Sequence, residues 1–198
     1  MMSGILSPAF LQAAGRAGKG APVGKIILDT QFADPTINSI SCTGEIKVST
    51  IKNGAALVET YTDLNGETLS IQADANTQIV ISGAEITACG IGQNTDYTKI
   101  SVKNTALTQL DCSSCYALTA LDVSKNTALT QLDCGYCTKL VSISYPATNS
   151  NVATAVAGAI TAADSTTGTV YTDSAAAYYS TIADAATAKG WTIAQIPE

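Results

Sequence analysis

The sequence predicts a mainly β protein in which a short stack of coils lies between two terminal caps. A pattern of apolar residues recurs every 21 to 22 residues over 86–146. The preceding residues alternate with the two-residue period of strands, and the final residues change to helical spacing. Hydrophobic residues make up 46% and charged residues 13% of the 198 residues, a composition that favours a β-rich, extended protein.

Residues 1–23 are predicted to form an N-terminal arm and linker. Residues 5–11 are expected to form a short helix, and the glycines and the proline that follow are typical of a flexible linker. A terminal arm is ordered only where something holds it, so we expect this one to anchor on other subunits of an assembly. Packing on its own chain is the alternative. The expected anchoring residues are Ile5, Leu6, Phe10 and Leu11.

Residues 24–85 are predicted to form an antiparallel β cap. Expected strands cover 25–29, 37–41, 45–50, 56–62, 68–73 and 78–82. Asn53-Gly54 and Asn65-Gly66 lie between such runs and predict type I′ hairpins, because both central residues of that turn need a positive φ. The unit is expected to cover the first apolar edge of the stack.

The repeat spans residues 86–146. Ile86-x-x-Cys89-x-Ile91-x-x-Asn94 returns as Leu107-x-x-Leu110-x-Cys112-x-x-Cys115 and as Leu129-x-x-Leu132-x-Cys134-x-x-Cys137, and a second row begins at Tyr97, Leu118 and Leu140. This spacing is the signature of leucine-rich repeats. A single coil cannot bury its own apolar residues, so we expect about three coils to stack and share one core.

The segment Leu121-Asp-Val-Ser-Lys-Asn-Thr-Ala-Leu-Thr-Gln-Leu-Asp-Cys134 resembles the repeat unit of leucine-rich-repeat proteins typical of Bacteroidales bacteria and their bacteriophages. The resemblance covers roughly a third of the chain. It implies a binding or adhesion module without catalytic residues. The fold expected is therefore a short leucine-rich-repeat solenoid of about three coils, with an antiparallel β N-terminal cap and an α/β C-terminal cap.

Residues 147–198 are predicted to form that C-terminal cap, in the order α-β-α-β. Helices are expected over 151–163 and 174–189, and strands over 168–172 and 191–195. Asn149 and Ser150 are candidate N-caps of the first helix. Gly190 directly follows the second helix, where a left-handed residue commonly ends a helix.

Two Cys-x-x-Cys pairs, Cys112 with Cys115 and Cys134 with Cys137, match the spacing of a four-cysteine zinc site. The repeat offers a second explanation. Cys112 and Cys134 stand at one of its apolar positions, and Cys115 and Cys137 at the position that accepts Asn or Cys. We therefore expect buried, reduced thiols and neither metal nor cofactor, with zinc as the alternative.

Polar residues of the repeat are expected on one exposed face, where carboxylates of neighbouring coils stack. This face is either a binding surface that tolerates cations or a solvated face that keeps the β surface soluble. The candidate binding residues are Thr108, Gln109, Asp111, Thr130, Gln131 and Asp133.

Histidine is absent, which excludes Ser-His and Cys-His nucleophiles and favours a protein that is not an enzyme. The ten basic residues are scattered and the net charge is -6, so we do not expect the protein to bind nucleic acid. No apolar run approaches the roughly 20 residues that a membrane span needs.

The sequence as a whole predicts a non-enzymatic structural or attachment protein, oligomeric and anchored by its arm. The expected setting is a bacteriophage virion, as a capsid-decorating or fibre subunit, because residues 1–20 lack the features of a secretory signal. The alternative is a cell-surface or secreted bacterial adhesin that binds protein or glycan.

Overall fold

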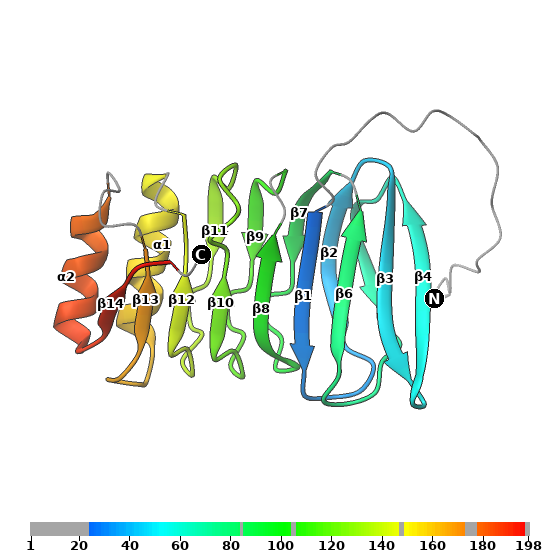
Figure 1. The fold of residues 1–198 in the computed structure, drawn as a ribbon, viewed down its shortest axis with the longest axis horizontal. Helices are drawn as coiled ribbons and strands as arrows, with labels where there is room; N and C mark the ends of the chain where they lie inside the picture. Colours follow the sequence, from blue (N-terminus) through cyan, green and yellow to red (C-terminus); the bar gives the residue numbers. More distant parts are fainter. Residues whose placement is uncertain (1–23, 84, 104–105, 147–148, 173–177, 197–198) are drawn as a thin grey trace.

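The computed structural model describes residues 24–83, 85–103, 106–146, 149–172 and 178–196, which form two sheets around one core (Figure 1). In one sheet, nine strands follow the order β14-β13-β12-β10-β8-β1-β6-β3-β4, and in the other five follow β11-β9-β7-β2-β5. The first eight strands are β1 (Gly24–Thr30), β2 (Thr36–Cys42), β3 (Glu45–Lys52), β4 (Ala55–Thr62), β5 (Asn65–Ser70), β6 (Gln78–Gly83), β7 (Ile86–Gly90) and β8 (Tyr97–Lys103). The later strands are β9 (Gln109–Asp111), β10 (Ala120–Asp122), β11 (Gln131–Asp133), β12 (Ser142–Ser144), β13 (Thr169–Tyr171) and β14 (Thr192–Ala194).

Strands β1, β3 and β6 alternate between buried and more exposed residues, as the sequence predicts. In β1, Ile26 and Leu28 are fully buried, whereas Lys25 is exposed. β1 pairs with β6 on one side and β8 on the other, and β2 lies between β5 and β7. Residues 24–85 therefore supply strands to both sheets, in which they are continuous with the repeat.

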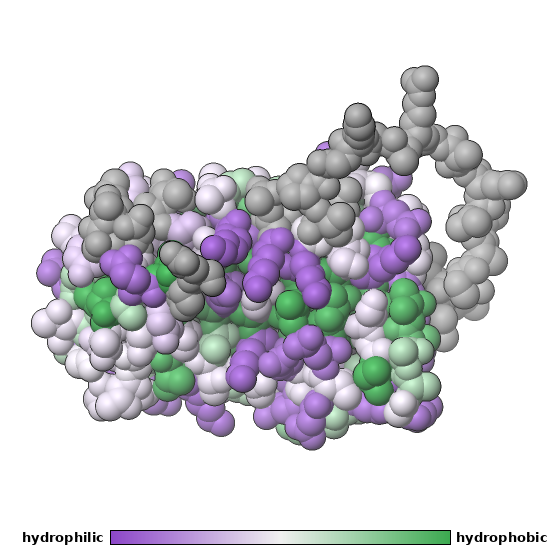
Figure 2. Space-filling model, viewed as in Figure 1, coloured by the Kyte–Doolittle hydropathy of each residue, from purple (hydrophilic) through white to green (hydrophobic). Residues whose placement is uncertain are grey.

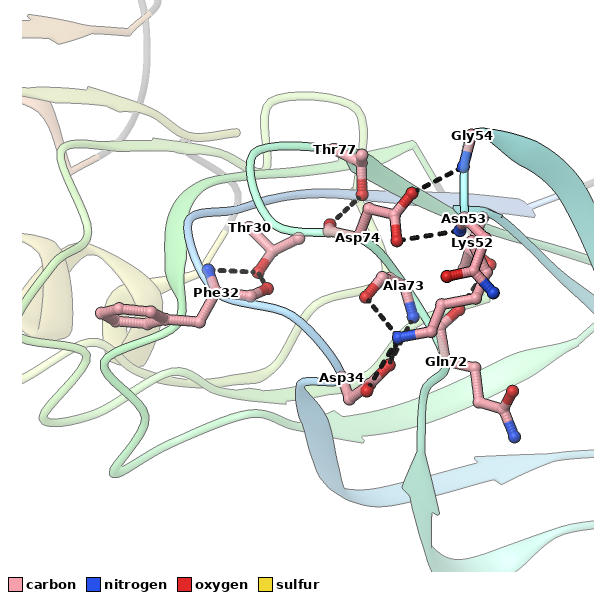
Figure 3. A network of polar contacts seen from close by, with 11 residues as sticks. Thr30, Phe32, Asp34, Lys52, Asn53, Gly54, Gln72, Ala73, Asp74 and Thr77 are labelled. Atoms are coloured by element: carbon pink, nitrogen blue, oxygen red, sulfur yellow. Dashed lines mark hydrogen bonds and ion pairs between the residues drawn. The ribbon is translucent and has the colours of Figure 1, made fainter.

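The β3–β4 hairpin is the predicted type of two-residue turn. Lys52 pairs with Ala55, and Asn53 and Gly54 have φ values of 53° and 72°. The carboxylate of Asp74 accepts hydrogen bonds from the backbone N–H of both turn residues, at 2.9 Å each (Figure 3). The hairpin end is therefore fixed to the loop that precedes β6.

Beside this turn, the Lys52 ammonium donates to both carboxylate oxygens of Asp34 at 2.6 and 2.8 Å (Figure 3). Asp34 also accepts from the Ala73 N–H. The hydrogen bond from Lys52, followed by that from Ala73, lowers the pKa of Asp34 below its ordinary 3.8. The same network thus connects the β1–β2 loop to the β3–β4 hairpin.

The prediction of a hairpin at Asn65-Gly66 is wrong. β5 begins at Asn65 but pairs with β2, not with β4, because the chain crosses here from the nine-stranded to the five-stranded sheet. Positive φ values occur at Asp63 (51°) and Gly66 (80°), so the left-handed residues form a crossover rather than a two-residue hairpin turn.

The repeat forms two parallel ladders, one in each sheet. Its first row gives β7, β9 and β11, in which Cys89, Leu110 and Leu132 are in register. Its second row gives β8, β10 and β12, in which Ile100, Leu121 and Ile143 are in register. All six side chains are buried, so the offsets of 21 and 22 residues set the register that stacks one core row upon the next.

The C-terminal segment continues the larger sheet through two crossovers. β12, β13 and β14 are parallel, and helix α1 (Ser150–Ala162) and helix α2 (Tyr179–Lys189) lie between them in the chain. Asn149 caps α1 by accepting from the Asn151 N–H, and Gly190 ends α2 with φ 82°. α1 also contacts β11, the last strand of the five-stranded sheet.

The prediction of a leucine-rich-repeat solenoid between two caps is wrong; the fold is mainly β, with two sheets of mixed strand direction. A leucine-rich repeat combines one strand with a helix or 3₁₀ segment in each unit. Here both rows of the repeat are strands, and each row belongs to a different sheet. The segments predicted as caps, 24–85 and 147–198, contribute strands to these same sheets. The spacing predicted stacking correctly but could not show what completes each sheet.

Candidate functional site

A shallow groove of about 410 Å³ lies on the outer face of the five-stranded sheet. It runs from Ser39 on β2, across β7, β9 and β11, to Asn151 at the start of α1. The residues that line it on the three parallel strands are Ala88, Cys89, Gly90, Gln109, Leu110, Asp111, Gln131, Leu132 and Asp133. Four of the six predicted binding residues therefore line one groove.

The strand register arranges the groove in two rows. Ala88, Gln109 and Gln131 are aligned in one row, and Gly90, Asp111 and Asp133 in the other. Adjacent members of a row are one strand spacing apart, about 4.8 Å. The predicted stacking of Asp111 on Asp133 is thereby confirmed.

The β7 end of the groove has a floor of small residues. A Cβ at Gly90 would lie 2.5 Å from Ser39 Oγ, so a side chain at this position would require the Ser39 hydroxyl to turn away. With Ala88 beside it, β7 presents little side-chain bulk, whereas β9 and β11 present an amide and a carboxylate each. The polar groups therefore stand beside a shallow depression rather than on a flat surface.

Asp111 and Asp133, in the row that begins at Gly90, each also stabilise the turn that follows their strand. Asp111 Oδ1 accepts from the N–H and the hydroxyl of Ser113, at 2.9 and 2.7 Å, and Asp133 Oδ1 accepts from the Gly135 N–H at 3.0 Å. Asp122 in the nine-stranded sheet makes the same turn with Ser124. Turn formation explains why aspartate recurs. It uses one carboxylate oxygen and leaves Oδ2 of Asp111 and Asp133 without a hydrogen-bond partner among the described residues.

Thr108 and Thr130, the other two predicted binding residues, belong to the backbone ladder. The Thr108 hydroxyl donates to the Thr87 carbonyl at 3.0 Å, and the Thr130 hydroxyl donates to the Thr108 carbonyl at 3.2 Å. Both residues therefore connect one strand to the preceding one. They do not line the groove.

Buried donors at the Asn-or-Cys position of the repeat bond the backbone of the preceding repeat. Cys115 Sγ donates to the Ile91 carbonyl at 3.2 Å, and Cys137 Sγ to the Cys112 carbonyl at 3.1 Å. Asn126 Nδ2, at the matching position of the second row, donates to the Val102 carbonyl at 2.6 Å. A buried backbone carbonyl needs such a partner, which explains why this position requires a donor.

The four cysteines of the two Cys-x-x-Cys pairs are buried free thiols, as are Cys42 and Cys89. Burial raises the pKa of Cys89 and of Cys115 to about 12. Within the described ranges, no group of three or more Cys, Asp or Glu residues is arranged to hold a metal ion. The structure thus places these thiols in the core, where those of Cys42, Cys115, Cys134 and Cys137 donate to backbone carbonyls.

Sequence reasoning missed Ser39 and Asn151, which form the two ends of the groove. Neither residue belongs to the repeat, so no periodic signal pointed to them. Two exposed tyrosines were also missed: Tyr116 is 49% and Tyr136 70% exposed, in the turns that follow β9 and β11. Tyr136 has a positive φ of 58°. Gln93 and Ser114, at the same position of the two preceding repeats, have similar φ values of 57° and 54°.

A second hollow, of about 420 Å³, lies beside β12, β13 and β14. Its lining is Val141, Thr167, Gly168, Thr169, Gly190 and Thr192, which offer hydroxyls but neither amide nor carboxylate side chains. The polar groups that could distinguish one ligand from another are therefore concentrated in the first groove.

No protein-family model, curated protein or solved structure matches the chain.

The predicted anchoring residues Ile5, Leu6, Phe10 and Leu11 lie outside the described residues. Neither helix of the described ranges has the length and apolar composition needed to cross a lipid bilayer. The groove is accordingly the best-defined candidate site.

Proposed function

We propose that the protein is a non-enzymatic attachment protein and that the groove across β7, β9 and β11 binds a carbohydrate. The observation that carries the proposal is the in-register repetition of Gln and Asp: Gln109 with Asp111, and Gln131 with Asp133. An amide donates and accepts hydrogen bonds and a carboxylate accepts two or more, which suits the hydroxyl groups of a sugar. The repeated spacing suits a ligand that extends over several strands.

The shape of the groove supports the same ligand class. The small Ala88 side chain leaves room for a ring over β7, and Ser39 and Asn151 add polar groups at the two ends. No Lys or Arg is among its described lining residues, so the groove does not favour phosphate or sulfate groups. A neutral, hydroxyl-rich ligand fits this lining best.

The lining also supports a binding role rather than a catalytic one. Cys89 is its only thiol among the described lining residues, and burial raises the pKa of this group to about 12. A thiol with that pKa is neutral at physiological pH and is a poor nucleophile. Asp111 and Asp133 are each bonded to their own turn, and histidine is absent from the chain.

The experiment is a glycan array probed with the full chain, followed by calorimetry with a retained oligosaccharide. Replacing Gln109 and Gln131 together by Ala is expected to raise the Kd at least about tenfold, as expected for the loss of about 1.4 kcal/mol of binding free energy. The double change Asp111→Asn, Asp133→Asn should also weaken binding, although Asn retains an oxygen for the turn. Asp122→Asn is the matched control, because Asp122 makes the same turn in the other sheet.

An array that retains no glycan would contradict the proposal, as would equal affinities for the wild type and the Gln109/Gln131 variant. Calcium binding that disappears in the Asp111/Asp133 variant, with no glycan retained, would indicate that these two carboxylates bind a cation instead.

We propose further that residues 1–23 anchor the chain in a bacteriophage particle, with a bacterial cell surface as the alternative setting. The support is the sequence of the arm, with its apolar residues Ile5, Leu6, Phe10 and Leu11. Deletion of residues 1–12 should abolish incorporation into particles, measured by mass spectrometry of purified virions. Particles that lack the wild-type chain, or that retain the truncated one, would contradict this setting.

A further inference from the structure

β4 forms an edge of the nine-stranded sheet and differs from the other sheet edges of the described chain. Edge strands of natural proteins are usually short, charged, interrupted by bulges or covered, because their free N–H and C=O groups can pair with another chain. β14 and β11 have three residues each, and α1 contacts β11. β5 is irregular, since its register against β2 shifts twice.

Among the described residues, β4 lacks these protections apart from a single charge. It pairs with β3 over eight residues without a register shift, and it contains no Pro, Gly, Lys or Arg. Glu59 is its only charged residue. Val58 is 58% exposed, and Ile51 on the neighbouring β3 is 37% exposed. Apolar residues over β3 and β4 are visible at the right-hand end of the face in Figure 2.

We infer that β4 pairs with β4 of a second copy in an antiparallel, two-fold symmetric dimer. With the two-fold axis perpendicular to the sheet, a residue can meet only residues that lie on the same face, which restricts the possible registers. An axis at Glu59 would bring two carboxylates together, which is destabilising. An axis at Val58 pairs residues 55–61 of both copies and places each Glu59 opposite Leu57 of the other copy.

The charge and the geometry of β4 suit this register. Glu59 and Tyr61 are half-buried, on the opposite face of β4 from Val58, and Glu59 accepts a hydrogen bond from the Tyr61 hydroxyl at 3.1 Å. At the axis, Val58 meets Val58 of the second copy, so an exposed apolar side chain becomes buried on the outer face. The network of Lys52, Asp34 and Asp74 holds the adjoining hairpin turn before pairing (Figure 3).

In this dimer the two nine-stranded sheets become one continuous sheet. β9 and β11, which line the groove, lie away from β4 (Figure 1). The two grooves would therefore face a ligand surface at separate points, and bivalent attachment strengthens binding without any new contact at either site. The dimer itself does not depend on the proposed ligand.

The test is sedimentation equilibrium of the full chain at concentrations from about 1 to about 200 μM, a range that covers micromolar Kd values. The expected result is a dimer of the 20.2 kDa chain. Val58→Lys places like charges directly opposite each other and should raise the dimer Kd at least about tenfold. Val58→Thr retains the strand propensity and should change the Kd by less than about threefold. Ala188→Lys, at an exposed position of α2, controls for the added charge and should leave the Kd unchanged.

Hydrogen exchange provides a second measurement that does not depend on variants. Amides within residues 55–61 should exchange more slowly at high than at low protein concentration, whereas those of β5 should not change. A monomer over the whole concentration range would overturn the inference. So would a dimer that Val58→Lys leaves intact, or one that is lost on deletion of residues 1–23 but not on Val58→Lys.

Discussion

Replacement of Asn126 by Ala tests whether the buried donors hold successive repeats together. Asn126 is fully buried, and its Nδ2 donates to the Val102 carbonyl at 2.6 Å and to the Val123 carbonyl at 3.2 Å. Each buried hydrogen bond contributes about 0.5–1.5 kcal/mol, and a carbonyl left unsatisfied costs about 1–3 kcal/mol. Asn126→Ala should therefore lower the free energy of unfolding by about 2–4 kcal/mol.

The assay is urea unfolding followed by far-UV circular dichroism. For a chain of this length, the same loss lowers Tm by about 5–15 °C, at about 2–4 °C for each kcal/mol. Asn126→Cys should cost only about 1 kcal/mol, because a thiol can donate to the same carbonyl, as Cys115 and Cys137 do. Thr127→Ala, at the exposed neighbour, is the control and should lie within about 0.5 kcal/mol of the wild type. An Asn126→Ala variant as stable as this control would refute the role of the donor.

Three further predictions concern strain, thiols and pH. Tyr136→Gly should raise the free energy of unfolding by about 0.5–1 kcal/mol in the same urea assay, because glycine adopts φ 58° without the Cβ clash; a destabilised variant would contradict this. Cys89 and Cys115, with pKa raised to about 12 by burial, should not react with Ellman's reagent at about pH 8 until the chain unfolds; rapid modification of the native protein would contradict their burial. The hydrogen bond from Lys52 lowers the pKa of Asp34 in the folded state. Ionised Asp34 therefore adds to the free energy of unfolding above its ordinary pKa of 3.8, and this stabilisation is lost as the pH falls through the lower pKa of the folded state. Unfolding free energy should therefore fall below about pH 4, and fall less steeply in Asp34→Asn; identical pH profiles would contradict this contribution.

The sequence predicted the parts of the fold that depend on local chemistry. Alternation located the six strands before the repeat to within three residues at either end, and Asn53-Gly54 formed the expected turn. Repeat spacing predicted the register of Asp111 with Asp133. In each case the information lies within one strand, one turn or one repeat, where burial and backbone conformation decide the outcome.

Beyond the Asn53-Gly54 hairpin and the stacking of the repeat, the sequence did not predict which strands would become neighbours. Asn65-Gly66 carries the same turn signal as Asn53-Gly54, yet the chain changes sheet there and β5 pairs with the edge of β2. The repeat spacing likewise predicted a solenoid, whereas the second row forms strands that join β1 in another sheet. Such pairings depend on residues far apart in the chain, which periodicity does not report.

The candidate site shows the same division. Gln109, Asp111, Gln131 and Asp133 were predicted because they recur, and the structure places them in one groove. Thr108 and Thr130 recur for a different reason, since their hydroxyls serve the backbone ladder. Periodicity shows that a residue is needed at each repeat, but only its hydrogen bonds show whether it serves the fold or remains available to a ligand.

Carbohydrate binding at the outer face of the five-stranded sheet is tested most directly by NMR chemical-shift mapping. The ¹⁵N-labelled chain would be titrated with an oligosaccharide retained on the array. The expected result is that the largest shifts occur in β9, in β11 and at Asn151, and that they include the side-chain amides of Gln109 and Gln131. Shifts confined to the second hollow, around Thr169 and Thr192, or no shifts at all, would contradict the proposed site.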